Sequence, residues 1–380
     1  MENKNTNPLG TEKIGSLLMK FAIPSIIAML VSSLYNIVDQ FFIGRSVGML
    51  GNAATNVAFP LSITCTALAL LCGIGGAANF NLAMGRKEKE KAVSFAGGAI
   101  GMMLLAGVVL TIVVTLFLKP MMLAFGATDN VLDYALTYTG ITSLGFPFLI
   151  VTTGGSNLIR ADGSPKYSMI CTLAGAIINT ILDPLFIFTF DMGMAGAAWA
   201  TIIGQVVSGI MVLGYLAKFK TVHIPLKALL PSKASWLPIL TLGIAPFFNQ
   251  MAMMIVQIVM NNTLTYYGGQ SSYGSEIPMA CAGIISKVGM IFFAIVIGIS
   301  QGIQPITANT FTSIGKSGKG VFLSLTRQII FLLPLLIILP IFMGIDGVMY
   351  SAPVADGIAA VFSAWFMWKE FKIIDKQMPN

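Results

Sequence analysis

Long apolar segments separated by short polar ones make up most of this sequence. A helix needs about 20 predominantly apolar residues to cross the hydrocarbon core of a bilayer. Segments that meet this length, with approximate ends, are 14–43, 53–83, 92–118, 131–157, 167–190, 194–217, 235–264, 277–308, 320–342 and 346–368. Several contain proline, and we expect the first segment to bend at Pro24. The pattern predicts an all-α polytopic membrane protein with about ten transmembrane helices.

Composition supports a membrane protein. Of the 380 residues, 56% are hydrophobic and 10% are charged, whereas soluble domains carry about 25% charged residues. The net charge of +7 could indicate nucleic-acid binding, but the basic residues are scattered through short loops. We therefore expect the lipid bilayer as partner and no nucleic acid. The four cysteines lie in apolar segments without a C-x-x-C pair, so we expect no disulfide, no metal site and no cofactor.

The distribution of basic residues predicts the orientation. Lys and Arg gather in the two terminal tails and in every second loop, while the alternate loops hold only Arg45 and Lys119. Basic residues collect on the cytoplasmic side of membrane proteins. Both termini should then be cytoplasmic, in the cell membrane, which requires an even number of spans. We expect 1–13 to be a cytoplasmic tail rather than a signal peptide.

An internal duplication divides the chain into two pseudo-symmetric helical bundles. Residues 161–220 recur as 314–372, and MGMAGAAWA (192–200) aligns with MGIDGVMYS (343–351). The predicted units are a six-helix lobe (14–217), a cytoplasmic linker (218–234), a second lobe shortened to four helices (235–372) and a tail (373–380). Parallel repeats of this kind flank a central cavity in many secondary transporters, although duplication can also simply build a stable bundle.

Three acidic residues lie well inside predicted spans, where a charged side chain costs roughly 2.5–3.5 kcal/mol. They are Asp39, Asp183 and Asp356. Helical spacing places further polar residues on the same faces as the first two. The candidates for a cation or proton site are Asp39, Asn179, Asp183 and Thr201, with Tyr35, Asn36 and Gln205 as supporting residues.

Two interpretations of these polar residues compete. They can be interhelical contacts, worth about 0.6 kcal/mol each, or they can bind an ion. The second copy has Gln257, Asn261 and Asn262 opposite Asp39 and no carboxylate opposite Asp183. If the carboxylates were needed only to hold the helices together, they should appear in both copies. Their absence from the second copy therefore favours an ion site in the first.

Further polar residues are candidates for a central cavity. Gln257, Lys287 and Asp356 lie inside spans of the second copy. Packing is an equal alternative for Asp356, and Lys287 could instead extend towards the cytoplasmic surface. The loop IGKSGKG (314–320) lacks the spacing of a phosphate-binding loop. We therefore expect a transporter driven by an ion gradient, not an ATPase or another enzyme.

The sequence resembles the multidrug and toxic compound extrusion (MATE) family, in its MepA-type bacterial branch. The motifs are IPSIIAMLVSSLYNIVDQFFIG (23–44), NLIRADGSPKYSM (157–169), INTILDPLFIF (178–188) and the duplicated MG-x-x-G turns. The resemblance implies two six-helix lobes and antiport of organic cations against H⁺ or Na⁺. It also implies a first-lobe cation site at Asp39, Asn179, Asp183 and Thr201. Family members have twelve spans, and this chain lacks equivalents of the ninth and tenth.

The function that we expect is a monomeric, H⁺- or Na⁺-coupled antiporter that exports small organic cations. No cofactor is expected other than the coupling ion, and no metal beyond Na⁺. A flippase for lipid-linked saccharides, of related fold, is one alternative, although its pyrophosphate cargo calls for more cationic residues in the spans. A truncated protein that does not transport is the other.

Overall fold

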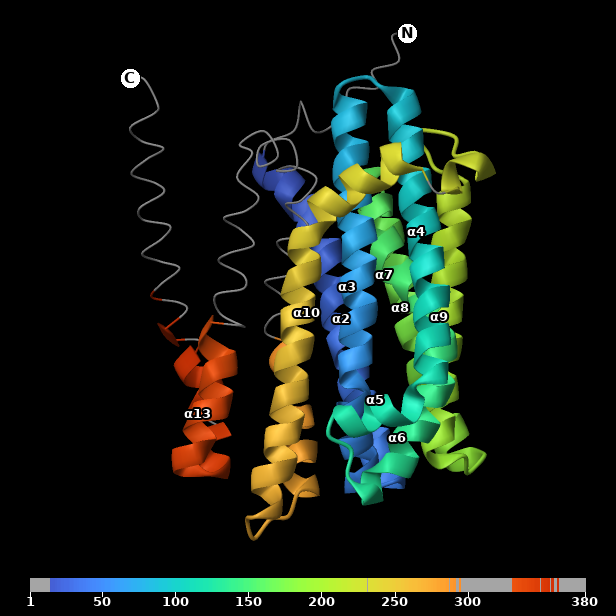
Figure 1. Ribbon diagram of the computed structural model, residues 1–380. Coiled ribbons are helices and arrows are strands. Elements are labelled where there is room, and N and C mark those ends of the chain that lie inside the picture. Colours follow the sequence, from blue (N-terminus) through green and yellow to red (C-terminus); the bar gives the residue numbers. More distant parts are fainter. Residues whose placement is uncertain are drawn as a thin grey trace.

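The computed structural model describes residues 14–361, apart from 231, 287, 292–293, 295–329, 349, 356 and 359–360. Seven segments of the described chain are helical, long and apolar enough to cross a membrane. They are α2 (Ile14–Ser46), α3 (Met49–Gly85), α4 (Lys89–Leu116), α6–η1–α7 (Asp129–Thr142, Ser143–Gly145 and Phe146–Ala161), α8–η2 (Pro165–Pro184 and Leu185–Thr189), α9 (Gly193–Ala217) and α10 (Lys233–Gly269). The described residues contain no strand, so the predicted all-α membrane fold is confirmed (Figure 1).

The remaining predicted spans fall partly outside the described residues. Residues 276–286 are helical at the start of the eighth span, and α13 (Leu333–Met343) lies near the end of the ninth. More than half of the duplicated segment 314–372 lies outside the described residues, as do Lys287 and Asp356.

Glycines allow the helices of the amino-terminal bundle to touch along their backbones. Added to Gly73 of α3, a Cβ atom would lie 2.5 Å from the carbonyl oxygen of Gly154 in α7. The same addition to Gly204 of α9 would place a Cβ atom 2.7 Å from the carbonyl oxygen of Gly175 in α8. Because lipid is as apolar as a protein core, close backbone contact is a main source of attraction between membrane helices. These contacts fix α8 beside α9, which positions the site below.

Helix α10, the first of the second repeat, packs along α3 of the first repeat (Figure 1). A Cβ atom on Gly75 of α3 would overlap the backbone of Ile239, and one on Gly243 of α10 would overlap the backbone of Leu71. Ile239 and Met279 belong to the same buried cluster as the amino-terminal bundle. The two repeats therefore meet through a continuous α3–α10 contact.

The predicted linker lies beside the upper part of the bundle in Figure 1. Its short helix η3 (Leu226–Leu229) lies against α4, where Gly97 and Gly101 leave room for its backbone. Asp162, in the turn between α7 and α8, ties down the start of the linker. Its carboxylate accepts hydrogen bonds from the Tyr215 hydroxyl (2.8 Å), the Lys220 amide (2.8 Å), and the amide (3.1 Å) and hydroxyl (2.7 Å) of Thr221.

Candidate functional site

Asp183 lies at the end of α8 and is completely buried. The Asn179 Nδ2 atom, one turn earlier, donates a 3.2 Å hydrogen bond to its Oδ1 atom. Pro184 follows, and the helix continues as the wider π-helical turn η2. Two buried oxygens here, Asp183 Oδ2 and Asn179 Oδ1, accept no hydrogen bond from the described residues. Oxygens with unused lone pairs are what a bound cation or a proton donor requires.

Asp39 of α2 lies near Asp183. Asp39 is 7% exposed, and its carboxylate is close enough to Asp183 for the two charges to interact. The half-buried Tyr35, one turn earlier in α2, interacts electrostatically with both carboxylates and is hydrogen-bonded by Asn36. Two carboxylates from different helices therefore share one buried region.

Thr201 reaches the site from α9 through a tyrosine that the sequence analysis missed. The hydroxyl groups of Thr201 and Tyr138 are hydrogen-bonded, and Tyr138 of α6 interacts electrostatically with Asp39 and Asp183. Thr201 also donates a 2.9 Å hydrogen bond to the Ala197 carbonyl oxygen of its own helix. The segment LDYALTYTGIT (132–142) shows that tyrosines are present, but its spacing does not distinguish Tyr138 from the more exposed Tyr134.

Gln205 lies one turn beyond Thr201 and borders a small cavity of about 40 Å³. Tyr138, Thr142 and Ser62 also line it, so hydroxyl groups surround a space large enough for a water molecule. The buried Gln205 Oε1 atom accepts no hydrogen bond from the described residues and packs against Gly145, where a Cβ atom would overlap it. Gln205 therefore lies near Thr201 and Tyr138.

Much of the chain is similar to known proteins. The MatE family model matches residues 24–185, which include Asp39, Asn179 and Asp183. The multidrug export protein MepA of Staphylococcus haemolyticus is 28% identical over 297 residues, 78% of this chain and 64% of its own length. MepA of Staphylococcus aureus strain MRSA252 is also 28% identical over the same shares. The chain is similar to MATE transporters. It spans 64% of the length of the curated MATE relatives that it matches.

Solved MATE structures have the same fold. The MATE multidrug transporter DinF-BH, solved in complex with a ligand, has a TM-score of 0.81 and 26% identity over 97% of this chain and 98% of that chain. A MATE transporter of the MOP superfamily in an outward-facing conformation has a TM-score of 0.80 at 20% identity, over the whole of both chains. The bundle that holds Asp39 and Asp183 is therefore part of a MATE fold.

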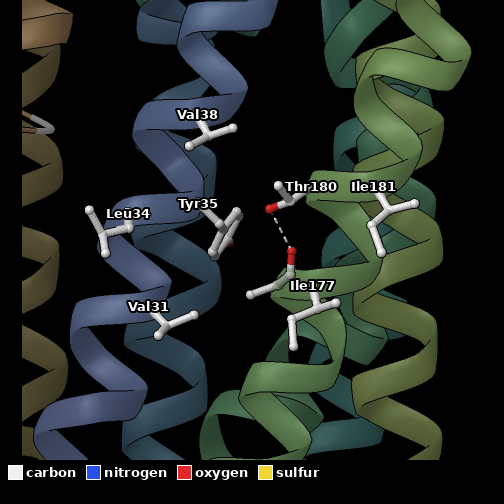
Figure 2. Close-up of a pocket in the computed structure, with 8 residues that line it drawn as sticks. Val31, Leu34, Tyr35, Val38, Ile177, Thr180 and Ile181 are labelled. Atoms are coloured by element: carbon white, nitrogen blue, oxygen red, sulfur yellow. Dashed lines mark hydrogen bonds between the residues drawn. The ribbon is translucent and has the colours of Figure 1, made fainter.

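A second cavity lies between α2 and α8 (Figure 2). Its volume is about 290 Å³, and its walls are mostly apolar: Val31, Leu34, Tyr35, Val38, Ala176, Ile177, Thr180 and Ile181. Figure 2 shows the Tyr35 ring between the two helices, directed towards α8. Tyr35 is the wall residue that also interacts with Asp39 and Asp183, so the cavity lies beside the carboxylates.

The other predicted site residues lie elsewhere. Pro24 is buried within α2, which continues through it. Gln257 is 7% exposed and bonds to Asn56 and Asn261 between α3 and α10; it lines neither cavity described above. Lys287 and Asp356 lie outside the described residues. Within the described part of the chain, no group of three or more His, Cys, Asp or Glu side chains could hold a metal ion.

Proposed function

We propose that this protein is an H⁺- or Na⁺-coupled antiporter that exports organic cations across the cytoplasmic membrane, with both termini on the cytoplasmic side. The observation that carries the proposal is the meeting of Asp39 and Asp183 in one buried region. Two MATE relatives are named as multidrug export proteins, and DinF-BH is named as a multidrug transporter. These names support drugs as the substrate class that we propose here.

The carboxylate pair would bind the coupling ion because two negative charges repel strongly where water is scarce. One proton or one sodium ion between Asp39 and Asp183 removes that repulsion. Asp183 Oδ2 and Asn179 Oδ1 provide acceptor oxygens that the described residues leave unused, and Thr201 adds a hydroxyl nearby. Carboxylate, amide and hydroxyl oxygens suit Na⁺, while either carboxylate alone can carry a proton. The proposed site therefore serves both coupling ions.

Ion binding would be coupled to transport through α2. This helix carries Pro24 in its first half and Asp39 in its second half. Proline has no backbone N–H and removes a helical hydrogen bond, so the helix bends most easily there. An ion that binds Asp39 and Asp183 favours the arrangement in which α2 lies close to α8. Release of the ion favours a different arrangement of α2. Alternating access requires that the two arrangements bind the ion with different affinities.

The experiment that tests the proposal is efflux of ethidium, a fluorescent organic cation, from cells that express Asp39→Asn. Asparagine keeps the size of aspartate and cannot exchange a positive partner, so efflux should fall to the level of cells without the protein. Asp133→Asn is the matched control, because Asp133 is exposed on α6, and it should export ethidium like the unchanged protein. Immunoblots must show equal amounts of all three proteins. Full efflux by Asp39→Asn would refute the proposed coupling.

A further inference from the structure

Three buried amide side chains join α3 and α10 near the end of the bundle that is lowermost in Figure 1. Asn56 of α3 is 2% exposed, and Gln257 and Asn261 of α10 are 7% and 0% exposed. The Asn56 Nδ2 atom donates to Asn261 Oδ1 at 3.0 Å. The Gln257 Nε2 atom donates to Asn261 Oδ1 at 3.0 Å and to Asn56 Oδ1 at 3.2 Å.

Two of these side chains, Asn56 and Asn261, also bind backbone atoms of the facing helices. Asn56 Nδ2 donates a 3.2 Å hydrogen bond to the Met279 carbonyl oxygen, in the helix after α10. Asn261 Nδ2 donates a 3.3 Å hydrogen bond to the Asn56 carbonyl oxygen. The cluster therefore connects the first repeat to two helices of the second repeat, although Asn56 and Asn261 are 205 residues apart.

Further hydrogen bonds between the repeats surround this cluster on its lower side. Backbone oxygens at the end of α5 (Leu118–Ala124) and in the turn after it accept hydrogen bonds from α10. Ala124 accepts from Asn262 at 3.0 Å, and Gly126 accepts from Thr265 at 3.2 Å. Gly126 has a positive φ of 97°, and a Cβ atom there would lie 3.3 Å from the backbone of Asn261 and Asn262. At the rim, Asn130 Nδ2 donates to Glu276 Oε1 at 2.8 Å.

The upper part of the α3–α10 contact is built differently. There Gly75 and Gly243 bring the backbones of the two helices together, and water cannot replace such packing. Amide groups differ in this respect. When two of them separate, each can form hydrogen bonds to water in place of the bond between them, at a small net cost in free energy. A contact made of amides can therefore be strong when dry and still open repeatedly.

We propose that Asn56, Gln257 and Asn261 form a latch that holds the lower, extracellular end of the α3–α10 contact closed and that releases when the transporter opens outward. This inference rests on the proposed alternating access and on the proposed orientation. It assigns the amides a conformational role, distinct from ion binding at Asp39 and Asp183.

The test measures the distance between spin labels at Asp133→Cys in α6 and Tyr266→Cys in α10. Both positions are exposed. Asp133 lies one turn after Asn130, which bonds to Glu276, and Tyr266 lies five residues after Asn261 in α10. Cys281 must first be replaced by serine because it is exposed, whereas Cys65, Cys72 and Cys171 are buried. Electron–electron double resonance on the full chain in lipid nanodiscs, without drug or gradient, then gives the ratio of open to closed populations. No transport is required for this readout.

Asn261→Ala should raise the open-to-closed ratio at least about threefold, the factor that one average polar contact between membrane helices represents. Gln257→Met keeps the length of the side chain and should raise the open-to-closed ratio by a similar factor. This variant replaces Asn261→Ala in the test if Asn261→Ala does not fold. Asn79→Ala is the matched control. It removes an asparagine that donates to the Pro238 carbonyl oxygen at the upper end of the same helix pair (3.0 Å), so the lower distances should stay unchanged.

Two outcomes would overturn the latch. One is an unchanged distance distribution in folded Asn261→Ala and Gln257→Met proteins. The other is an equal shift in Asn79→Ala, which would show that any weakening of the α3–α10 contact has the same effect. If the latch variants shift the distances but the protein exports no ethidium, the proposed transport fails and the latch stands.

Discussion

Replacing Asp183 by asparagine should stabilise the fold while it removes transport. Asp183 is completely buried, and the described residues give it one hydrogen bond, from Asn179 at 3.2 Å. Its charge also lies near that of Asp39. Asparagine has nearly the same volume and carries no charge, so Asp183→Asn removes the cost of a buried carboxylate without leaving a void.

The magnitude follows from two opposing contributions. A charged aspartate at the bilayer centre costs roughly 2.5–3.5 kcal/mol, and a hydrogen bond to a charged group returns about 1.5–3 kcal/mol. Repulsion by Asp39 adds to the cost. We therefore expect Asp183→Asn to gain about 1 kcal/mol, which corresponds to a rise in Tm of about 2 °C for a protein of this size class.

The assay compares apparent Tm values from fluorescence-detected size exclusion with ethidium efflux from cells. The melting runs use sodium-free alkaline buffer, in which the carboxylates of the unchanged protein lack a positive partner. We expect Asp183→Asn to have a higher Tm than the unchanged protein and to show no efflux. A lower Tm together with normal efflux would show that the Asp183 carboxylate is a structural hydrogen-bonding group, and would refute the reasoning.

Two further predictions concern the frame around the site. Asp162→Ala leaves four hydrogen-bond donors without their acceptor. Because each bond to a carboxylate contributes about 1.5–3 kcal/mol, the free energy of unfolding should fall by at least ~3 kcal/mol, which lowers Tm by about 6 °C. Asp162→Asn should lose about half as much stability, and equal Tm values for all three proteins would contradict this role of Asp162. Gly204→Val should separate α8 from α9 and reduce ethidium efflux, whereas Gly214→Val, in an open position of α9, should leave efflux intact; equal efflux would show that the close α8–α9 contact is not needed.

The membrane spans could be predicted from the sequence because hydrocarbon thickness sets a minimum length for each apolar segment. Seven predicted spans coincide with helices of the described chain to within a few residues at most ends. Asn179 and Asp183 could also be paired in advance, because positions four apart on one helix are always neighbours.

Which side of each helix faces protein could not be predicted. In a soluble protein the buried face is apolar and the exposed face is polar, but lipid is as apolar as a core, so both faces of these helices look alike. Tyr138 was missed for this reason: its neighbour Tyr134 is equally plausible by sequence, and only packing of α6 on α9 turns Tyr138 towards Thr201.

The partner of a polar residue on another helix could not be predicted either. Gln257 and Asn261 stood out as polar residues of the second repeat, and we interpreted Gln257 as a cavity residue. The structure pairs both with Asn56, about 200 residues earlier, through a contact between the repeats that no local pattern encodes. Sequence spacing defines the face of one helix, whereas the α3–α10 contact depends on how two bundles dock.

In the proposed mechanism, Asp39 and Asp183 together hold one positive partner that the drug displaces or exchanges. The most direct measurement is the number of protons or sodium ions released when ethidium binds to purified protein in weakly buffered nanodiscs, followed with a pH indicator and a sodium-selective probe. The unchanged protein should release one kind of ion, and Asp39→Asn/Asp183→Asn should bind ethidium without releasing either. Undiminished release from this double variant would contradict it.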